Sequence, residues 1–139
     1  MAGVRLICDT GPLVAFFNRA DQFHRWAQEQ FERFKHPLET CEAVVSEAVF
    51  LLQEDGHPAD PVFEAIERNQ LIVQFTTGEH WPDLRRLIHK YRNLPMSLAD
   101  ACLVRMSELV PQCQMVTTDR QFRIYRRHGR QLIPLLAPF

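Results

Sequence analysis

The chain has 139 residues, of which 46% are hydrophobic and 24% are charged, and its formal net charge is −1. These values are typical of one globular domain, residues 1–139, that can bury a core without disulfides or a structural metal. No run of about 18 apolar residues and no signal-peptide pattern is present, which predicts a cytoplasmic protein without a membrane span. The four cysteines are scattered and form no C-x-x-C pair, so we expect reduced core residues rather than a zinc site or a disulfide framework.

The small net charge hides an uneven distribution along the chain. Residues 1–84 hold 6 basic and 14 acidic side chains, whereas residues 85–130 hold 10 basic and 3 acidic ones. This asymmetry suggests that the C-terminal part meets a polyanionic partner, although a solvated basic helix surface would look the same in sequence.

The first predicted element is a short apolar strand over residues 4–8 that stops at Asp9, followed by Gly11-Pro12 and a helix over residues 12–18. In an open α/β sheet, ligands bind at the carboxyl ends of the strands, which places Asp9 at the mouth of a site. The competing interpretation of Asp9 is an N-cap of the helix that follows.

Helices and strands alternate along the rest of the chain. Helices are predicted over residues 22–34, 42–52, 60–68, 79–92 and from 97 onward, and strands over residues 38–41, 71–75, from 114 to the stop at Asp119, and 132–136. A short arginine-rich helix containing Phe122 and Tyr125 lies before the last strand. The alternation predicts a three-layer α/β/α domain with a central, mainly parallel sheet.

Three of these helices carry distinctive apolar patterns. The helix over residues 22–34 has an aromatic stripe, which favours a core or dimer contact over a base-stacking surface. In the helix over residues 79–92 we expect Trp81 and Leu84 to point inward. Between residues 43 and 52 only Ser46 and Glu47 are polar, which predicts a largely buried helix that carries Glu47 close to the interior. A buried carboxylate needs an arginine, hydrogen-bond donors or a metal.

Each of two further acids could either cap a helix or belong to a functional site. Ser97-x-x-Asp100 fits a capping box at the start of a helix, and Asp119 fits an N-cap of the next short helix. Asp119 also repeats the design of Asp9, because each aspartate ends a short apolar strand. Parallel strands that end at one edge would bring these two together, and the flanking helices could deliver Glu47 and Asp100 there.

A cluster of Asp9, Glu47, Asp100 and Asp119 would be tolerated only with a counter-ion. An all-oxygen ligand set without cysteine or histidine favours Mg²⁺ or Mn²⁺ over Zn²⁺. Such a site beside a basic surface suits phosphodiester hydrolysis by a metal-activated water. Thr10 and Thr117 could orient carboxylates or waters around it, or could be ordinary turn and strand residues.

Four stretches resemble the PIN-domain nucleases, and among them the VapC-like toxins of type II toxin–antitoxin systems. They are residues 7–15 (ICDTGPLVA), 44–48 (VVSEA), 96–101 (MSLADA) and 116–122 (VTTDRQF), in the order of the family. The resemblance implies a compact α/β/α fold, an Mg²⁺- or Mn²⁺-dependent endoribonuclease acting on RNA, a homodimer, and inhibition by a small antitoxin protein. It also assigns catalytic and metal-binding roles to Asp9, Glu47, Asp100 and Asp119, and Thr117 matches the hydroxyl residue two positions before the last acid.

One position departs from the pattern of the family. Many relatives carry a further aspartate two residues after the fourth acid, where this chain has Gln121. The departure implies that a second metal binds weakly or not at all.

The arginines after Asp119 have two candidate roles. Arg120, Arg123, Arg126 and Arg127 could guide RNA phosphates toward the acids, or could bind an acidic segment of an antitoxin. The alternative function is a PIN-like module that binds RNA or protein without cleaving it. An aspartate-nucleophile phosphatase fits poorly, because Asp9-Thr10-Gly11 lacks a second aspartate two residues on.

Overall fold

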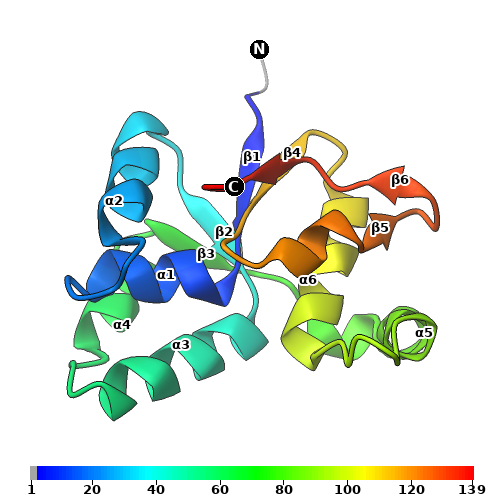
Figure 1. The fold of residues 1–139 in the computed structure, drawn as a ribbon, viewed down its shortest axis with the longest axis horizontal. Coiled ribbons are helices and arrows are strands. Elements are labelled where there is room, and N and C mark those ends of the chain that lie inside the picture. Colours follow the sequence, from blue (N-terminus) through cyan, green and yellow to red (C-terminus); the bar gives the residue numbers. More distant parts are fainter. Residues whose placement is uncertain (1–2) are drawn as a thin grey trace.

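The computed structural model describes residues 3–139 and is organised around a five-stranded parallel sheet, with helices packed on both faces (Figure 1). The strands, in sequence order, are β1 (Arg5–Cys8), β2 (Leu38–Thr40), β3 (Leu71–Val73), β4 (Cys113–Val116) and β7 (Leu135–Leu136). Their spatial order is β3-β2-β1-β4-β7, and every neighbouring pair is parallel. The predicted three-layer α/β/α architecture is therefore confirmed.

The helices form two groups around this sheet, one containing α1 to α4 and the other α5 and α6 (Figure 1). They are α1 (Thr10–Phe17), α2 (His24–Arg33), α3 (Glu42–Glu54), α4 (Asp60–Glu67), α5 (Trp81–Lys90) and α6 (Leu98–Leu109), with 3-10 turns η1 (Thr77–Glu79) and η2 (Arg120–Arg123). None of the helices in residues 3–139 has the length and apolar character needed to cross a bilayer.

Strand β1 occupies the middle of the sheet because it is apolar on both faces. Leu6, Ile7 and Cys8 are at most 1% exposed, as expected for a parallel strand covered by helices on either side. Its last residue, Cys8, pairs with Val116 of β4, and the Asp9 amide donates to the Val116 carbonyl at 2.9 Å. The segments that carry Asp9 and Asp119 therefore leave the sheet side by side.

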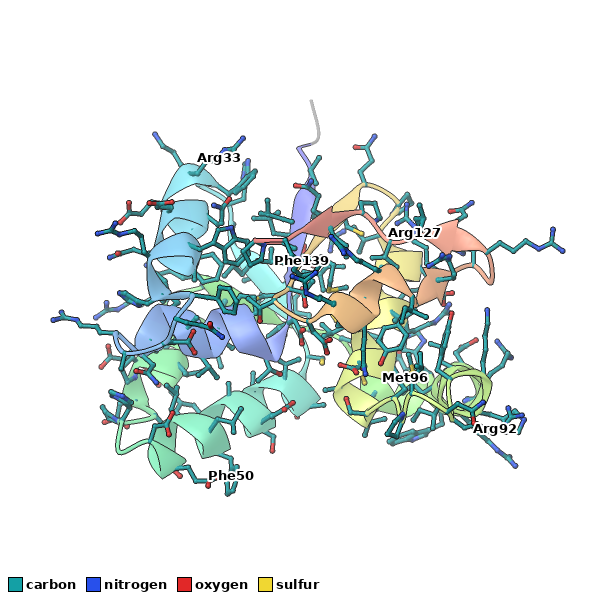
Figure 2. All side chains as sticks on the ribbon, in the orientation of Figure 1. Arg33, Phe50, Arg92, Met96, Arg127 and Phe139 are labelled. Carbon is teal, nitrogen blue, oxygen red and sulfur yellow. The ribbon has the colours of Figure 1, made fainter. Side chains whose placement is uncertain are left out.

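Two of the burial predictions are wrong. Helix α3 is amphipathic rather than buried: Glu47 is exposed, and Phe50 is 60% exposed and points away from the sheet (Figure 2). Trp81 was expected to face inward, but it is 54% exposed because it occupies the first turn of α5, ahead of the buried Leu84. Each helix packs through one face only, α3 mainly against α1 and α6 and α5 mainly against α6, so apolar residues elsewhere around the helix stay in solvent.

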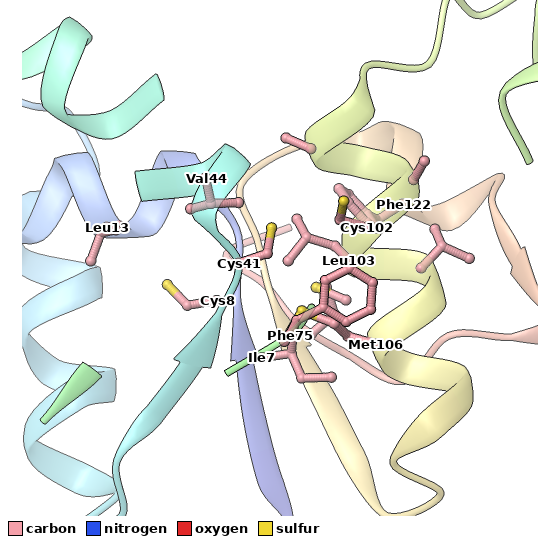
Figure 3. Close-up of a cluster of buried hydrophobic side chains, with 14 of the residues drawn as sticks. Ile7, Cys8, Leu13, Cys41, Val44, Phe75, Cys102, Leu103, Met106 and Phe122 are labelled. Atoms are coloured by element: carbon pink, nitrogen blue, oxygen red, sulfur yellow. The ribbon is translucent and has the colours of Figure 1, made fainter. Parts of the chain in front are cut away.

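The core lies between β1, the start of α3 and helix α6, which is the most continuously buried helix (Figure 3). All four cysteines are buried and free, as predicted, and lie at positions 8, 41, 102 and 113. In the aromatic stripe of α2, the Phe31 ring packs 5.0 Å from Phe16 against this core. The stripe therefore makes at least one core contact, as its pattern indicated.

The C-terminal part differs from the prediction in two respects. The short helix after Asp119 is the 3-10 turn η2, and it leads into an antiparallel hairpin of β5 (Arg126–Arg127) and β6 (Gln131–Leu132). His128 and Gly129, at the tip, both have positive φ angles, of 52° and 79°. The predicted strand over residues 132–136 is thus divided between this hairpin and β7.

Candidate active site

A cleft of about 760 Å³ opens at the carboxyl ends of β1 and β4. Its lining contains all four acids predicted from the sequence, which come from β1, α3, α6 and the end of β4: Asp9, Glu47, Asp100 and Asp119. Residues separated by up to 110 positions in the chain therefore share one cavity. Parallel strands produce this convergence, because they release their carboxyl ends at the same edge of the sheet.

Asp9 is both a helix cap and a cleft residue, so its two interpretations are compatible. Its Oδ1 accepts a hydrogen bond from the Thr10 amide at 2.7 Å, at the start of α1. Its Oδ2 accepts from the Thr117 hydroxyl at 2.7 Å. The side chain is thereby fixed in one orientation while the residue is only 6% exposed.

Thr117 connects the two strand ends through a single hydroxyl. Besides donating to Asp9, its Oγ1 accepts a hydrogen bond from the Asp119 amide at 2.9 Å. Asp119 in turn accepts from the Gln121 amide at 2.9 Å and caps η2, as its local interpretation predicted. Thr117 is fully buried, so it holds this arrangement without contact with solvent.

Asp100 likewise combines a local role with a place in the cleft. The Ser97 Oγ accepts from the Asp100 amide at 3.0 Å, which confirms that serine caps α6. The Oδ2 of the Asp100 carboxylate accepts from the Tyr125 hydroxyl at 3.0 Å. The same hydroxyl lies 3.0 Å from Gln121 Oε1.

Glu47 reaches the cleft from an exposed position on α3, contrary to the expectation of a nearly buried carboxylate. The Thr10 hydroxyl donates to its Oε2 at 3.1 Å. Thr10 thus contacts one acid through its amide and another through its side chain, which gives it the orienting geometry proposed from the sequence.

Gly11 allows these elements to approach closely. A Cβ atom at this position would lie 2.2 Å from the Thr118 Oγ1, well inside van der Waals contact. Glycine therefore lets the first turn of α1 lie against the segment that follows β4, where both Thr118 and Asp119 border the cleft.

The environment of the cleft raises the pKa of two of its acids, Asp9 and Asp100. Burial raises the pKa of Asp9 to about 7, although the hydrogen bonds from Thr117 and Thr10 lower it, and the charges of Asp100 and Asp119 raise it further. Burial also raises the pKa of Asp100, while the bond from Tyr125 lowers it. Within residues 3–139, none of the four acids forms an ion pair with lysine, arginine or histidine.

The donor set suits a hard divalent cation. Four carboxylates that border one cleft without arginine partners are the ligands that Mg²⁺ and Mn²⁺ prefer. Across residues 3–139, no three Asp, Glu, His or Cys side chains are already drawn together at the spacing of a metal centre. A bound cation would therefore draw these carboxylates closer together than they lie in this structure.

The four candidate RNA- or antitoxin-binding arginines divide into two pairs. Arg120 borders the cleft, and Arg120 and Arg123 both lie over the Phe139 ring. Arg126 and Arg127 are instead bonded to backbone carbonyls, Arg127 to Ser107 at 3.0 Å and Arg126 to Arg123 at 2.7 Å. The structure thus brings Arg120 alone among the four into the cleft lining.

The sequence did not reveal three side chains that take part in the site. Asp21 borders the cleft, and its Oδ1 accepts from the Phe23 amide at 2.8 Å. Tyr125 and Gln121 were assigned no contact with the acids. The one available signal was Gln121, which stands where many relatives of the resembled family have an aspartate.

Replacing Tyr125 with phenylalanine should weaken the site without unfolding the protein. Loss of the bond to Asp100 removes a donor that favours the carboxylate form, so we expect about 1 kcal/mol less stability and about tenfold slower RNA cleavage. Urea unfolding and initial cleavage rates measure the two effects. Tyr91→Phe is the control, because its hydroxyl accepts only from the Arg126 amide and should affect stability alone. Equal cleavage rates in the two variants would contradict the role of Tyr125.

Comparison with known proteins yields a match at the level of structure. No family model matches the chain, and no curated protein does. Among solved structures it is similar to VapC20 of Mycobacterium tuberculosis, described as a toxin that cleaves the sarcin-ricin loop, with a TM-score of 0.71 and 19% identity. The match covers 83% of this chain and 90% of that one. The chain therefore has the PIN-like fold of the VapC toxins, as its four acidic motifs implied.

Proposed function

We propose that the chain is an Mg²⁺- or Mn²⁺-dependent endoribonuclease and the toxin of a VapBC-like toxin–antitoxin pair. The observation that carries this proposal is the cleft in which four unpaired carboxylates converge from β1, α3, α6 and β4. It is supported by a fold shared with VapC20, whose description is that of a toxin cleaving the sarcin-ricin loop.

The acids and the threonines of the cleft would have different roles. Asp9, Glu47, Asp100 and Asp119 would hold the cation, which when bound supplies Lewis-acid stabilisation of the scissile phosphate and activates a water. Thr117 and Thr10 hold Asp9 and Glu47 in fixed orientations by the hydrogen bonds described above. Because these hydrogen bonds already restrict the two side chains, cation binding would cost less conformational entropy.

RNA is the proposed substrate because a polyanion complements the basic half of the chain. Arg120 lies directly beside Asp119 at the rim of the cleft, where it can meet a phosphate oxygen adjacent to the bond that is cleaved. The other exposed cations of residues 85–130 would attract the strand by a longer-range, salt-dependent effect. A ribonuclease of this kind would act in the cytoplasm, where RNA and divalent cations are both present.

A homodimer and an antitoxin partner are also proposed. Exposed apolar side chains lie on three helices: Phe50 and Leu51 on α3, Trp81 on α5 and Leu98 on α6. A second copy of the chain would remove this apolar surface from water. An antitoxin with acidic side chains could instead compete with RNA for Arg120.

Cleavage of a mixed RNA pool tests the enzymatic proposal. We expect purified wild-type protein to cut RNA with Mg²⁺ or Mn²⁺, and expect the cuts to disappear with EDTA or after Asp9→Asn. The variant removes a carboxylate oxygen from the centre of the cleft and keeps the size of the side chain. Binding of RNA without any cleavage would favour the alternative, a PIN-like binding module. Equal cleavage by both proteins would place the activity elsewhere.

A further inference from the structure

Phe139 lies under two arginines at the rim of the cleft. The guanidinium carbon of Arg123 is 4.5 Å from the centre of its ring, and that of Arg120 is 5.0 Å away. Both distances fall within the range of cation–π attraction. Phe139 reaches this position because β7 runs parallel to β4, so the segment after Leu136 continues toward the edge that carries Asp119. In Figure 2 it lies near the centre of the view, between the two groups of helices.

The position of Arg120 is unexpected for a cation beside four acids. Arg120 borders the same cleft as the carboxylates, yet in residues 3–139 the arginines that form ion pairs are Arg5, Arg86 and Arg105. An unrestrained guanidinium beside Asp119 would be attracted to the acids, and a bidentate arginine–carboxylate pair would occupy the oxygens that a dication needs.

We propose that Phe139 is a positioning residue that holds Arg120 away from the carboxylates and presents it, with the neighbouring Arg123, to an RNA phosphate. The proposal rests on the proposed function, since it assumes that the acids bind a dication and the cleft binds RNA. Phe139 itself contacts neither group; it acts through the two guanidiniums. With the arginines held by the aromatic ring, the carboxylates stay available for a dication and the arginines for an RNA phosphate.

The geometry favours this role over direct stacking of Phe139 on an RNA base. Aromatic side chains that stack bases present an open ring face, whereas both guanidiniums lie over the Phe139 ring. A base that stacks on the face covered by an arginine would first have to displace it. The two roles predict different effects on cation binding, because a base-stacking residue has no influence on the affinity of the acids for a dication.

Mn²⁺ affinity, measured by calorimetry without RNA, tests the proposal. Releasing Arg120 should make Phe139→Ala bind Mn²⁺ about threefold to tenfold more weakly than the wild type, as the strength of cation–π contacts indicates. Phe139→Trp retains an aromatic face and should bind as the wild type does. In the double variant Phe139→Ala/Arg120→Ala, wild-type affinity should return, because the cation that competes for the acids is gone. Phe63→Ala, on α4 outside the cleft, is the matched control and should change nothing.

The outcomes separate this proposal from the proposed function. Wild-type Mn²⁺ affinity in Phe139→Ala, or no recovery in the double variant, would overturn the positioning role while leaving the nuclease proposal intact. If Phe139→Ala raises only the KM for RNA, Phe139 stacks on a base instead. A wild-type protein that binds no Mn²⁺ would overturn both.

Discussion

In the absence of divalent cations, Asp9→Asn should be more stable than the wild type at pH 7 to 8, although it should not cleave RNA. The wild-type carboxyl is buried and has its pKa raised from 3.8 to about 7, so ionising it costs free energy in the folded state. Asparagine keeps the shape and carries no charge. The difference between the two proteins should reach at most about 4 kcal/mol, from about 1.4 kcal/mol per pKa unit.

This difference in stability should depend on pH in a defined window. Below about pH 4 the carboxyl is protonated in both the folded and unfolded states, so Asp9 causes no destabilisation. Between pH 4 and about 7 the folded state holds more protons than the unfolded state, so wild-type stability falls as pH rises. Above about pH 7 the loss is complete. Burial raises the pKa of Asp100 as well, which adds a contribution of the same sign.

Urea unfolding of both proteins at several pH values in EDTA measures the effect. The difference between wild type and variant is the informative quantity, because the other titrating groups are common to both. Asp60→Asn, which removes an exposed carboxylate from α4, should change stability by less than about 0.5 kcal/mol at every pH. A wild-type minus variant difference that stays constant from pH 4 to 8 would show that Asp9 is not buried in the charged cleft described here.

Replacing Thr117 with valine should damage both the fold and the site. Valine preserves the shape but leaves the buried Asp9 Oδ2 without its donor and the partly buried Asp119 amide without its acceptor. Two unpaired polar groups should lower the free energy of unfolding by about 2–4 kcal/mol, and cleavage should fall about tenfold to a hundredfold. Thr117→Ser retains the hydroxyl and should recover most of both losses.

A second buried threonine provides the control for Thr117. Thr40 is also fully buried, and its hydroxyl donates to the Cys8 carbonyl at 2.8 Å on the neighbouring strand, outside the cleft lining. Thr40→Val should therefore cost stability without lowering Mn²⁺ affinity. Circular dichroism melts and Mn²⁺ titrations separate the two variants. If they lose Mn²⁺ affinity equally, Thr117 acts only through the general stability of the sheet.

The parts of the site that follow from strand direction were predictable from the sequence. Two short apolar strands that each stop at an aspartate define parallel neighbours, and the rules of parallel sheets bring Asp9 and Asp119 to one edge. The predicted caps at Asp9 and Asp119 were also correct, and Ser97 makes the serine half of the predicted capping box. Capping and cleft roles coexist because a carboxylate has two oxygens, and a cap uses only one of them.

The predictions were wrong or incomplete where a residue's surroundings depend on elements that are distant in the sequence. An apolar count over residues 43–52 suggested a buried helix, but α3 packs through one face and leaves Glu47 and Phe50 in solvent. The contact between Tyr125 and Asp100 joins residues 25 positions apart, one in the segment between η2 and β5 and the other on α6. No periodicity links these two elements, so sequence spacing could not reveal the bond.

The order of the strands has a consequence for biosynthesis. Strand β1 emerges from the ribosome first, yet one of its partners in the sheet is β4, and Asp119 follows β4 more than a hundred residues after Asp9. A nascent chain that stops short of β4 has only part of the acidic cleft and cannot close the edge of the sheet around it. If the protein cleaves RNA, that activity therefore cannot appear before β4 and Asp119 have been synthesised.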